Sequence, residues 1–267
     1  MSAQAAATFR WPRRDASAEE VLRWGFEELG DRIAICTSFQ ASGMAIIDMA
    51  ACITGGDVTV FSLDTGRLHE ETYELIEDVR KRYGIKIELL TPEQGELSRM
   101  ISLHGPNLFY EQIAKRRLCC EIRKVRPLSR KLATLDAWVV GLRRDQSTAR
   151  DTVETVTLDE EHGGVIKLAP LAHWTQEQVW DYVRRNDVPV HKLYEQGYPS
   201  IGCRPCTRPI KEGEPPRAGR WWWEDEEDKE CGIHVSPSGQ MRRSFDVLLE
   251  EVLPGRGRAA SSPGGGI

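Results

Sequence analysis

Short apolar runs alternate with amphipathic segments along most of this 267-residue chain, and the alternation leaves few folds open to it. The apolar runs are rich in β-branched and aliphatic residues and are too short for helices, which is typical of buried strands. We predict strands at residues 32–37, 57–63, 85–90 and 137–142, and helices at 17–29, 44–53, 175–189 and within 64–84. Strands that alternate with helices form a mainly parallel sheet with helices on both faces, so the predicted fold class is α/β.

Local signals mark where some of these helices begin or end. Ser17 and Glu20 have the spacing of a capping box, which predicts a helix start. Gly84 ends the helix predicted within 64–84, and Pro189 stops the helix predicted at 175–189. From about Pro189 onward Gly, Pro and charged residues replace the periodic pattern, so we predict an irregular C-terminal tail.

Composition argues against two classes of protein. No stretch approaches the ~20 consecutive apolar residues of a membrane-spanning helix, so no membrane association is expected. The formal net charge of -5 argues against a protein that coats nucleic-acid phosphates, although local basic clusters could still hold a small anion. A nucleotide-sized ligand remains open.

The loops that follow the predicted strands carry residues suited to binding an anion. Ser38, Ser42 and Gly43 follow the first strand, where the serines offer hydroxyls and the next helix offers free N–H groups. Capping of that helix by the serines is an equally good interpretation. The loops after the second and last predicted strands add Asp64, Thr65, Gly66, Arg143, Arg144 and Arg150. Because ligands bind beyond the carboxyl ends of parallel strands, these loops together favour an anion pocket over isolated surface arginines.

Seven cysteines in a chain without an apolar signal segment indicate the reducing cytosol, where clustered cysteines mean metal or catalysis more often than disulfides. Cys36 and Cys52 lie in apolar runs, and we predict that both are small buried hydrophobes. A disulfide between Cys119 and Cys120 would close a strained ring across one peptide bond. The remaining candidates for chemistry are Cys119, Cys120, Cys203, Cys206 and Cys231.

The tandem cysteines and the Cys203–Cys206 pair supply four thiolates, and Cys-x-x-Cys is a spacing shared by zinc and iron–sulfur sites. Zinc, an iron–sulfur cluster and free thiols are all open at this point. Adjacent cysteines inside a helix suit the separated corners of a cubane better than a single tetrahedral ion. Nearby cations would offset the negative charge of a four-thiolate [4Fe–4S] centre, namely Lys115, Arg116, Arg117, Arg123 and Lys124.

A series of motifs resembles those of the assimilatory adenylylsulfate (APS) reductases of bacteria. In order they are SFQASG, SLDTGRL, KRRLCCEIRKVRPL, GLRRDQS, IGCRPCTRP, GRWWWED and ECGIH, and they cover nearly the whole chain between about residues 30 and 235. The resemblance implies an adenine-nucleotide α-hydrolase-like α/β fold with Cys231 as nucleophile. It also implies one [4Fe–4S] cluster per chain, ligated by Cys119, Cys120, Cys203 and Cys206. Ile233 stands where Leu is usual, and the thioredoxin-like C-terminal domain of the plant enzymes is absent, so a separate thioredoxin is expected.

The resemblance implies a reaction in two parts. A Cys231 thiolate attacks the sulfur of APS, which releases AMP and leaves an S-sulfocysteine on the enzyme. Reduced thioredoxin then attacks the Cys231 sulfur, expels sulfite and ends as its own disulfide. Both electrons come from thioredoxin, so the cluster has no required redox step. Lys124, one helical turn from Cys120, is expected to join the cluster's surroundings to the phosphosulfate, and His234 is expected to assist Cys231.

Placing APS requires cations for a phosphate and a sulfonate, and besides Lys124 the candidates are Arg143, Arg144, Arg217 and Arg220. Arg217 and Arg220 could instead balance the acidic run at residues 224–230, but the resemblance favours substrate contact. The tryptophans at 221–223 are either a docking anchor for the tail or part of the thioredoxin contact surface.

The chain is expected to divide into four segments. Residues 1–16 form a flexible arm, 17–210 the α/β domain that binds nucleotide and cluster, 211–240 a C-terminal active-site tail, and 241–267 a partly disordered terminus. The arm lacks the apolar core of a secretion signal, so a cytoplasmic protein is expected. The oligomeric state stays open, homo-oligomers included.

Two alternative functions remain. Phosphoadenylylsulfate (PAPS) reductases share the nucleophile motif but typically lack the cluster cysteines, and some cluster-bearing members use both substrates. A PAPS or dual APS/PAPS reductase is therefore the nearest enzymatic alternative. A zinc-stabilised nucleotide-binding module without catalysis is the alternative from another class. It predicts a colourless protein, whereas a [4Fe–4S] protein is brown.

Overall fold

The structure, a computed structural model, describes residues 11–13, 15–147, 150–224 and 239–255. The chain forms two compact units. The first combines Met1–Leu90 with Leu128–Trp222, and the second combines Thr91–Pro127 with Trp223–Ile267. The segment boundaries expected after residues 16, 210 and 240 stay predictions.

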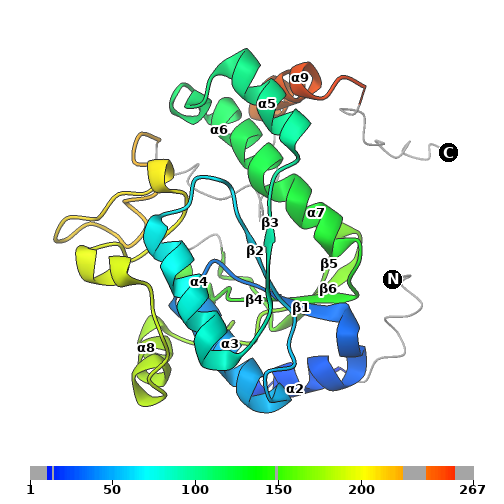
Figure 1. The fold of residues 1–267 in the computed structure, drawn as a ribbon, viewed down its shortest axis with the longest axis vertical. Coiled ribbons are helices and arrows are strands. Elements are labelled where there is room, and N and C mark those ends of the chain that lie inside the picture. Colours follow the sequence, from blue (N-terminus) through cyan, green and yellow to red (C-terminus); the bar gives the residue numbers. More distant parts are fainter. Residues whose placement is uncertain (1–10, 14, 148–149, 225–238, 256–267) are drawn as a thin grey trace. The chain divides into compact units, whose positions relative to one another are not determined.

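Within the described residues, a six-stranded sheet lies in the first unit, in the order β3-β2-β1-β4-β6-β5 (Figure 1). Its strands are β1 (Ile33–Cys36), β2 (Val60–Leu63), β3 (Ile87–Leu90), β4 (Ala137–Val140), β5 (Val156–Asp159) and β6 (Val165–Leu168). Neighbouring strands are parallel from β3 to β6, and β5 runs antiparallel to β6 at the edge. The predicted mainly parallel sheet is confirmed. Strands β1 to β4 were predicted, and β5 and β6 were not.

The helices of the first unit begin and end at residues that satisfy the free backbone groups there. The predicted capping box is present, because Glu20 N–H donates to Ser17 Oγ (3.2 Å) and Ser17 N–H donates to Glu20 Oε2 (2.6 Å). Gly84, at a φ of 66°, ends α4 as predicted. The α-helices are α2 (Ala18–Leu29), α3 (Ala41–Thr54), α4 (Glu70–Tyr83), α8 (Gln176–Arg185) and α7 (Arg126–Leu132), which enters from the second unit. Short 3₁₀ turns are η1 (Gly30–Arg32), η4 (Arg144–Gln146), η6 (Glu160–His162), η7 (Lys192–Gln196) and η8 (Arg204–Cys206).

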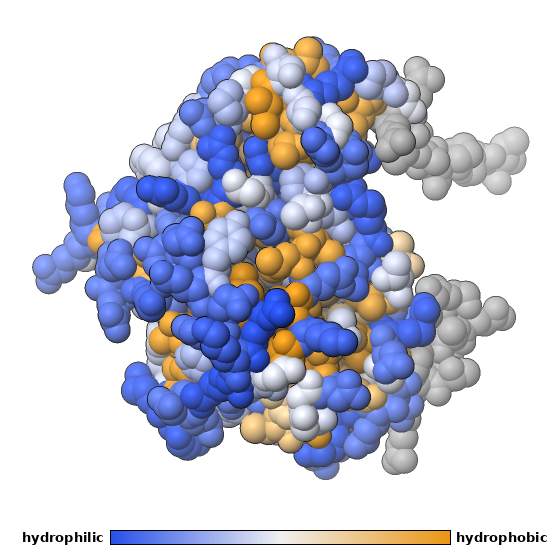
Figure 2. Space-filling model, viewed as in Figure 1, coloured by the Kyte–Doolittle hydropathy of each residue, from blue (hydrophilic) through white to orange (hydrophobic). Residues whose placement is uncertain are grey.

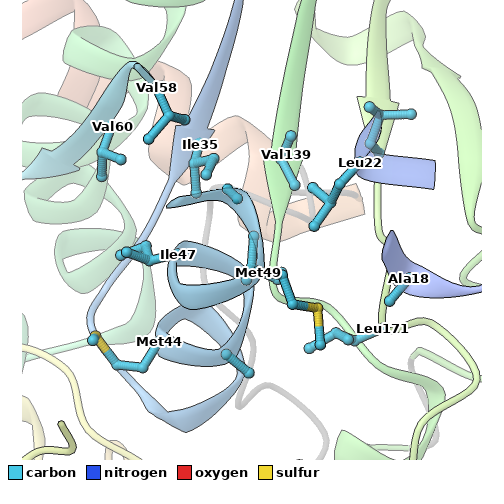
Figure 3. Packing of buried hydrophobic residues seen from close by; sticks show 14 of the residues in the cluster. Ala18, Leu22, Ile35, Met44, Ile47, Met49, Val58, Val60, Val139 and Leu171 are labelled. Atoms are coloured by element: carbon cyan, nitrogen blue, oxygen red, sulfur yellow. The ribbon is translucent and has the colours of Figure 1, made fainter. Parts of the chain in front are cut away.

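One apolar core joins α2, α3, α4 and α8 to the same face of the sheet. Ile35 of β1 pairs with Val60 of β2 and with Val139 of β4, and all three belong to this core. Met44 and Ile47 of α3 are fully buried in it (Figure 3). Because α3 is apolar around most of its circumference, it must be covered on several sides, and α2 and α8 both pack against it.

Neighbouring residues of the same strands point to the opposite face, as the alternation of side chains in a strand requires. Phe61 and Trp138 are fully buried on that face. Lys131 of α7 lies over the Phe61 ring, 5.9 Å from its centroid, and Leu128 and Leu132 of α7 are buried as well. Helices therefore cover both faces of the sheet, as predicted.

A buried carboxylate ties three helices together. Asp48 of α3 accepts hydrogen bonds from the hydroxyls of Tyr83 at the end of α4 and Tyr182 of α8, each at 2.8 Å. Burial, and then the bond to Asp48, raises the pKa of both tyrosines, so both stay protonated donors. A hydrogen bond to a charged group contributes about 1.5–3 kcal/mol net, so this shared acceptor helps to fix the mutual placement of α3, α4 and α8.

The two cysteines of the apolar runs differ from each other. Burial raises the pKa of the Cys36 thiol to about 12, so this thiol stays protonated at neutral pH. The prediction that Cys52 is buried is wrong, because its side chain is exposed. The continuously buried part of α3 ends at Ala50, and Cys52 lies beyond it.

The described part of the second unit is built from helices. They are α5 (Gln94–His104), η2 (Leu108–Tyr110), α6 (Ile113–Cys120), a π-helical turn η3 (Glu121–Val125) and α9 (Gly239–Val252). Helix α9, which was not predicted, packs against α6 and α5 at the top of Figure 1. Its contacts with α6 are among the most extensive between any two elements described.

The outer surface carries many polar side chains. On the face drawn in Figure 2, hydrophilic residues predominate and hydrophobic ones appear between them. Among the described residues, none of the helices combines the length and the apolar character that crossing a membrane requires.

A cluster of buried charges lies on the antiparallel edge pair of the sheet. The carboxylate of Asp159, the last residue of β5, lies 3.0 Å from His162 Nδ1 and 3.0 Å from Lys167 Nζ. Burial by itself would raise the pKa of Asp159, but the two partners outweigh burial and lower the pKa to about 2. Lys167 also lies over the ring of Trp138, 5.0 Å from its centroid.

We expect this cluster to make the stability of the protein depend on pH in acid. The folded-state pKa of Asp159 is below its usual value of 3.8, so the stabilisation is complete above that value and is lost as the pH falls toward about 2. Asp159→Asn should lower the free energy of unfolding by about 2 kcal/mol at neutral pH. The free energy of unfolding of both proteins is measured with urea between about pH 5 and 2. The difference between the two proteins reports on Asp159, because the other titrating groups are common to both. A difference between them that does not shrink with falling pH would contradict the assigned charge pairing.

Candidate active site

The loop after β1 holds the start of α3 close to the sheet. Phe39 has a φ of 56°, which is rare for a residue with a side chain; its N–H donates to Thr37 Oγ1 (2.9 Å) and its ring is fully buried. Gly43 faces the same Thr37 hydroxyl so closely that a β-carbon would overlap it. Gly141, which follows β4, approaches from the other side, where a β-carbon would lie 3.1 Å from Gly43 N. The first turn of α3 thus begins beyond the carboxyl end of β1, where the backbone N–H groups of a helix N-terminus can bind an anion.

Neither serine of this loop caps α3, although the sequence left that open. Gln40 is the N-cap residue, and no side chain bonds to the cap. Ser38 Oγ accepts a hydrogen bond from Gln40 Nε2 (3.0 Å), and Ser42 Oγ accepts one from Arg143 Nη1. Each hydroxyl therefore has its own side-chain partner at the edge of the sheet, Gln40 for Ser38 and Arg143 for Ser42.

Arg143 joins the loop after β4 to the starts of α3 and α8. Its side chain is only 4% exposed. Arg143 Nε donates to Asp145 Oδ1 (2.9 Å), and its two Nη groups donate to Ser42 and to Gln176. The guanidinium expected to bind substrate thus has three protein partners that fix its position.

Arg144 has a different environment from its neighbour. Its Nε donates to the carbonyl of Val153 (2.7 Å), and its Nη2 donates to Glu154 Oε1 (2.9 Å). The side-chain hydrogen bonds of Arg144 therefore go to residues 153–154, whereas those of Arg143 go to Asp145, Ser42 and Gln176.

The loop after β2 is a tight turn built on Asp64. Asp64 Oδ1 accepts hydrogen bonds from Gly66 N–H (2.8 Å) and from the Tyr73 hydroxyl (2.8 Å). Burial, followed by the bond to Asp64, raises the pKa of Tyr73 to about 12, so this hydroxyl stays a donor. Asp64 shapes the loop by these bonds, and the backbone of Gly66 closes the turn.

Two contacts join this loop to the Cys-x-x-Cys segment. Thr65 is fully buried, and its Oγ1 lies 3.3 Å from Cys203 Sγ. Two residues on, the carbonyl of Arg67 accepts a hydrogen bond from Arg204 N–H (2.8 Å). A hydroxyl beside a sulfur can donate to a thiolate, so Thr65 is suited to stabilise the ionised form of Cys203.

The Cys-x-x-Cys segment itself is a short turn with two buried thiols. Cys206 N–H donates to the carbonyl of Cys203 (2.9 Å), and the Thr207 hydroxyl donates to that same carbonyl (3.0 Å). The carbonyl of Cys206 in turn accepts from Trp221 N–H (3.2 Å). Neither cysteine is in a disulfide, so both thiols are available as ligands.

Arg220 connects this segment to the loop after β1. The residue is 6% exposed, and its guanidinium lies over the Trp221 ring, 4.6 Å from the centroid. Arg220 Nη1 lies 3.4 Å from the carbonyl of Ile201, whose own N–H donates to Gln40 Oε1 (2.9 Å). Because Gln40 also donates to Ser38, a continuous chain of polar contacts runs from Arg220 to Ser38. Arg217 is part-buried and accepts the N–H of Arg220 at its carbonyl (2.9 Å).

Two further residues of this network were missed from the sequence. Gln40 bridges Ser38 and Ile201, and the hydroxyl of Tyr194 accepts from Ala41 N–H at the start of α3 (2.9 Å). Burial raises the pKa of Tyr194 to about 12. Gln40 was visible inside the quoted SFQASG motif, but Tyr194 stands in a segment without periodicity and gave no signal.

The second unit carries the tandem cysteines at the end of α6. Cys119 and Cys120 are buried and not in a disulfide. The π-helical turn that follows, Glu121–Val125, contains Lys124, and such wide turns are frequent at functional sites. Two of the basic residues expected to offset a cluster have protein partners instead: Lys115 pairs with Glu111, and Arg116 pairs with Glu224. Arg117 and Arg123 are buried in the same stretch.

Two candidate residues, Cys231 and His234, lie outside the described residues. Within the residues that are described, no group of three or more His, Cys, Asp or Glu side chains that could hold a metal ion is found. The tandem cysteines belong to the second unit, and Cys203 and Cys206 to the first. As a donor set the four thiols fit an iron–sulfur or a zinc site, because all are buried and outside disulfides, and thiolates are the ligands that both groups use.

Comparison with known proteins places these residues in context. Residues 32–209 match the phosphoadenosine phosphosulfate reductase domain. The chain is 45% identical to the adenosine 5'-phosphosulfate reductase of Burkholderia cepacia, over 87% of this chain and 93% of that one. It is 44% identical to the adenosine 5'-phosphosulfate reductase of Allochromatium vinosum, over 84% and 86% of the two chains.

A solved structure supports the same relationship. The crystal structure of phosphoadenylyl-sulfate reductase from Candida auris, a phosphate complex, superposes with a TM-score of 0.62 and 28% identity over 73% of this chain and 91% of that one. Its likeness agrees with an adenine-nucleotide α-hydrolase-like fold. The domain match spans the whole described sheet together with the Cys-x-x-Cys segment, and the relatives are similar over most of their length. The chain therefore belongs to the phosphoadenosine phosphosulfate reductase family.

Proposed function

We propose that this protein reduces adenosine 5'-phosphosulfate to sulfite and AMP, with thioredoxin as reductant, in assimilatory sulfate reduction and cysteine biosynthesis. The observation that carries the proposal is the 45% identity, over 87% of this chain, to a protein named adenosine 5'-phosphosulfate reductase. The buried thiols of the two cysteine pairs and the polar network at the carboxyl edge of the sheet support it. Its reliance on reduced thiols is consistent with a cytoplasmic setting.

The substrate would bind across the loops after β1 and β2. The N–H groups of the first turn of α3 and the hydroxyls of Ser38 and Ser42 suit its anionic end. Gly43 lets the start of α3 lie directly against Thr37, and Arg220 supplies a buried positive charge that polar contacts join to Ser38. The turn at residues 64–66 would contact the substrate through its backbone. Arg217 stays a candidate, while the contacts of Arg144 with Val153 and Glu154 argue for a structural role.

Sulfur transfer would use Cys231. Its thiolate attacks the sulfur of the sulfonate group, a bond forms between the two sulfur atoms, and the bond from sulfur to the phosphate oxygen breaks. AMP leaves with the electron pair of that bond, and an S-sulfocysteine remains. Lys124 is proposed to neutralise charge on the phosphosulfate, and His234 to assist Cys231.

Thioredoxin would complete the cycle. One of its thiolates attacks the Cys231 sulfur, and sulfite leaves with the electron pair of the broken sulfur–sulfur bond. The second thioredoxin thiolate then attacks the mixed disulfide, which returns the Cys231 thiol. Thioredoxin is oxidised by two electrons, and sulfur falls from the oxidation state of sulfate to that of sulfite.

We propose that Cys119, Cys120, Cys203 and Cys206 hold one [4Fe–4S] cluster. When bound, the cluster would supply fixed negative charge that organises the cations around the site, and no electron has to pass through it. The contact of Thr65 with Cys203 supports this role, because a hydroxyl donor lowers the cost of a buried thiolate. A zinc-stabilised binding module would use the same thiols but would give a colourless protein without turnover.

The nearest alternative is reduction of PAPS, alone or together with APS. The Candida auris relative is named a phosphoadenylyl-sulfate reductase, and the matched domain carries the same substrate in its name. Steady-state kinetics with both nucleotides separates the alternatives. A kcat/KM for PAPS that exceeds the value for APS would replace the proposed substrate.

The two classes of cysteine should respond differently to replacement. Cys231→Ser should keep its iron and bind APS but form no adduct, because an alcohol is far less nucleophilic than a thiolate at neutral pH. Replacing any one of Cys119, Cys120, Cys203 and Cys206 by Ser should lower the iron content and bleach the protein. The measurement is intact-protein mass after mixing with APS without thioredoxin. The unsubstituted enzyme should gain about 80 Da, the mass of SO₃, and lose it on adding reduced thioredoxin. An adduct on Cys231→Ser would refute the assignment.

Arg220 and Arg144 should differ in their effect on substrate binding. Arg220→Met removes a buried charge from the network at the sheet edge and should raise the Kd for APS by about 10-fold to 100-fold, the value of one or two charge-assisted hydrogen bonds. Arg144→Met, the matched control, should change that Kd by less than about threefold. Both are measured by calorimetry in the Cys231→Ser background, which cannot react. Equal effects of the two replacements would contradict the distinction drawn from their contacts.

Lys124→Ala should retain its cluster and lose most of its turnover. A charge-assisted contact to the phosphosulfate is removed, while the proposed ligands remain. We expect kcat/KM for APS to fall by about 100-fold or more, as for loss of one preorganised donor, with an unchanged iron content. Turnover at the level of the unsubstituted enzyme would rule out the role assigned to Lys124.

A further inference from the structure

Gln40 bridges two segments of the first unit. Its side-chain Oε1 accepts a hydrogen bond from Ile201 N–H (2.9 Å), and its Nε2 donates to Ser38 Oγ (3.0 Å). Gln40 is also the N-cap residue of α3, and no side chain bonds to that cap. Its amide thus joins the loop after β1 to the segment that leads into Cys203.

The two contacts fix which way the amide of Gln40 faces. A backbone N–H can only donate, so the amide oxygen must face Ile201 and the amide nitrogen must face Ser38. That nitrogen can only donate as well, so Ser38 Oγ is the acceptor of the bond between the two side chains. A serine hydroxyl has one hydrogen and two lone pairs. Because a lone pair of Ser38 serves Gln40, its hydrogen is directed to an acceptor other than Gln40.

The backbone around Ser38 is held in place, while Ser38 itself is exposed. Its two neighbours are buried, with Thr37 5% exposed and Phe39 0% exposed. Phe39 N–H donates to Thr37 Oγ1 (2.9 Å), which closes the turn around Ser38. Ser38 follows β1 at its carboxyl end, where ligands bind in parallel sheets. The main freedom left at this position is rotation of the hydroxyl, and Gln40 restricts that rotation.

The segment that Gln40 contacts is itself tied to the start of α3. The hydroxyl of Tyr194 accepts a hydrogen bond from Ala41 N–H (2.9 Å). Ile201 is 4% exposed, and its carbonyl lies 3.4 Å from Arg220 Nη1. The amide of Gln40 is therefore held against a buried part of the same unit, which fixes the direction of its nitrogen.

We propose that Gln40 is a positioning residue that orients the Ser38 hydroxyl to donate to the anionic end of the substrate. Gln40 acts through Ser38 and does not contact the substrate. In the proposed function, on which this role rests, the anionic end is the phosphosulfate of APS. A donor that is already oriented loses less freedom on binding than one that rotates. Its hydrogen bond to an anion is also stronger than a bond between neutral groups.

A second glutamine of the same unit provides a matched control. Gln178 Oε1 accepts a hydrogen bond from Thr175 N–H (2.7 Å), so its amide oxygen also serves a backbone donor. That bond belongs to the capping box of α8. Gln178→Met therefore removes the same kind of bond as Gln40→Met and should leave the Ser38 hydroxyl unchanged.

The test is a double-mutant cycle between Gln40→Met and Ser38→Ala, with Gln178→Met as the control. All proteins carry Cys231→Ser, which prevents the reaction. Calorimetry gives the Kd for APS and for adenosine, which lacks the anionic end, and urea unfolding gives the stability of each protein. Gln40→Glu is a second variant that keeps an acceptor for Ile201 N–H, so it should fold even where Gln40→Met does not. Its added charge acts with and without the Ser38 hydroxyl, so the cycle still isolates the coupling between the two residues.

We expect Ser38→Ala to raise the Kd for APS by about tenfold, as for loss of one hydrogen bond to a charged group. Gln40→Met should raise it by about threefold to tenfold, with the Kd for adenosine within about twofold of its starting value. Added to Ser38→Ala, Gln40→Met should change the Kd for APS by less than about twofold, because no hydroxyl is left to orient. Gln178→Met should lower stability and leave both Kd values unchanged.

Three results would overturn the positioning role alone. They are an equal effect of the residue 40 variants with and without the Ser38 hydroxyl, an equal loss of affinity for adenosine, and an effect of Gln178→Met as large as that of Gln40→Met. If the protein with Cys231→Ser alone binds APS no more tightly than adenosine, the proposed function and this inference fail together.

Discussion

The close approach of the first turn of α3 to the ends of β1 and β4 determines the form of the candidate site. It is possible only because Gly43 and Gly141 have no side chains. A β-carbon at either position would push α3 away from the sheet. The N–H groups at its start, and the contact between Ser42 and Arg143, would move with it. The apolar core also depends on this close contact between α3 and the sheet, because the buried side chains of α3 fill the core on that face of the sheet.

Much of the fold could be predicted because its signals are local. Apolar runs marked β1 to β4, and a capping box and a glycine marked the ends of two helices. Strands β5 and β6 were missed because both include charged residues, and what makes them strands is the pairing of β5 with β6 and of β6 with β4. Helix α9 was missed because its partner, α6, lies more than 100 residues away in the sequence.

The candidate site could be predicted as a set of residues but not as a set of contacts. The motifs identified the cysteines and the loops, since spacing along the chain carries that information. Sequence could not separate Arg143 from Arg144, which are adjacent and alike, yet one is buried between α3 and α8 and the other is bound to residues 153–154. Nor could it show that Arg116, expected to serve a cluster, is neutralised by a carboxylate 108 residues away. Both outcomes depend on tertiary partners.

The strand order has a consequence for how the chain folds during synthesis. Strand β1 pairs on one side with β2, which follows it after a single helix, so that side can close early. Its other side pairs with β4, where Ile33 meets Ala137, about 100 residues later. Until β4 leaves the ribosome, the open edge of β1 is an apolar strand whose backbone groups can pair with another chain. All of the sequence between β3 and α7 belongs to the second unit, so the synthesis of that stretch sets how long the edge stays open.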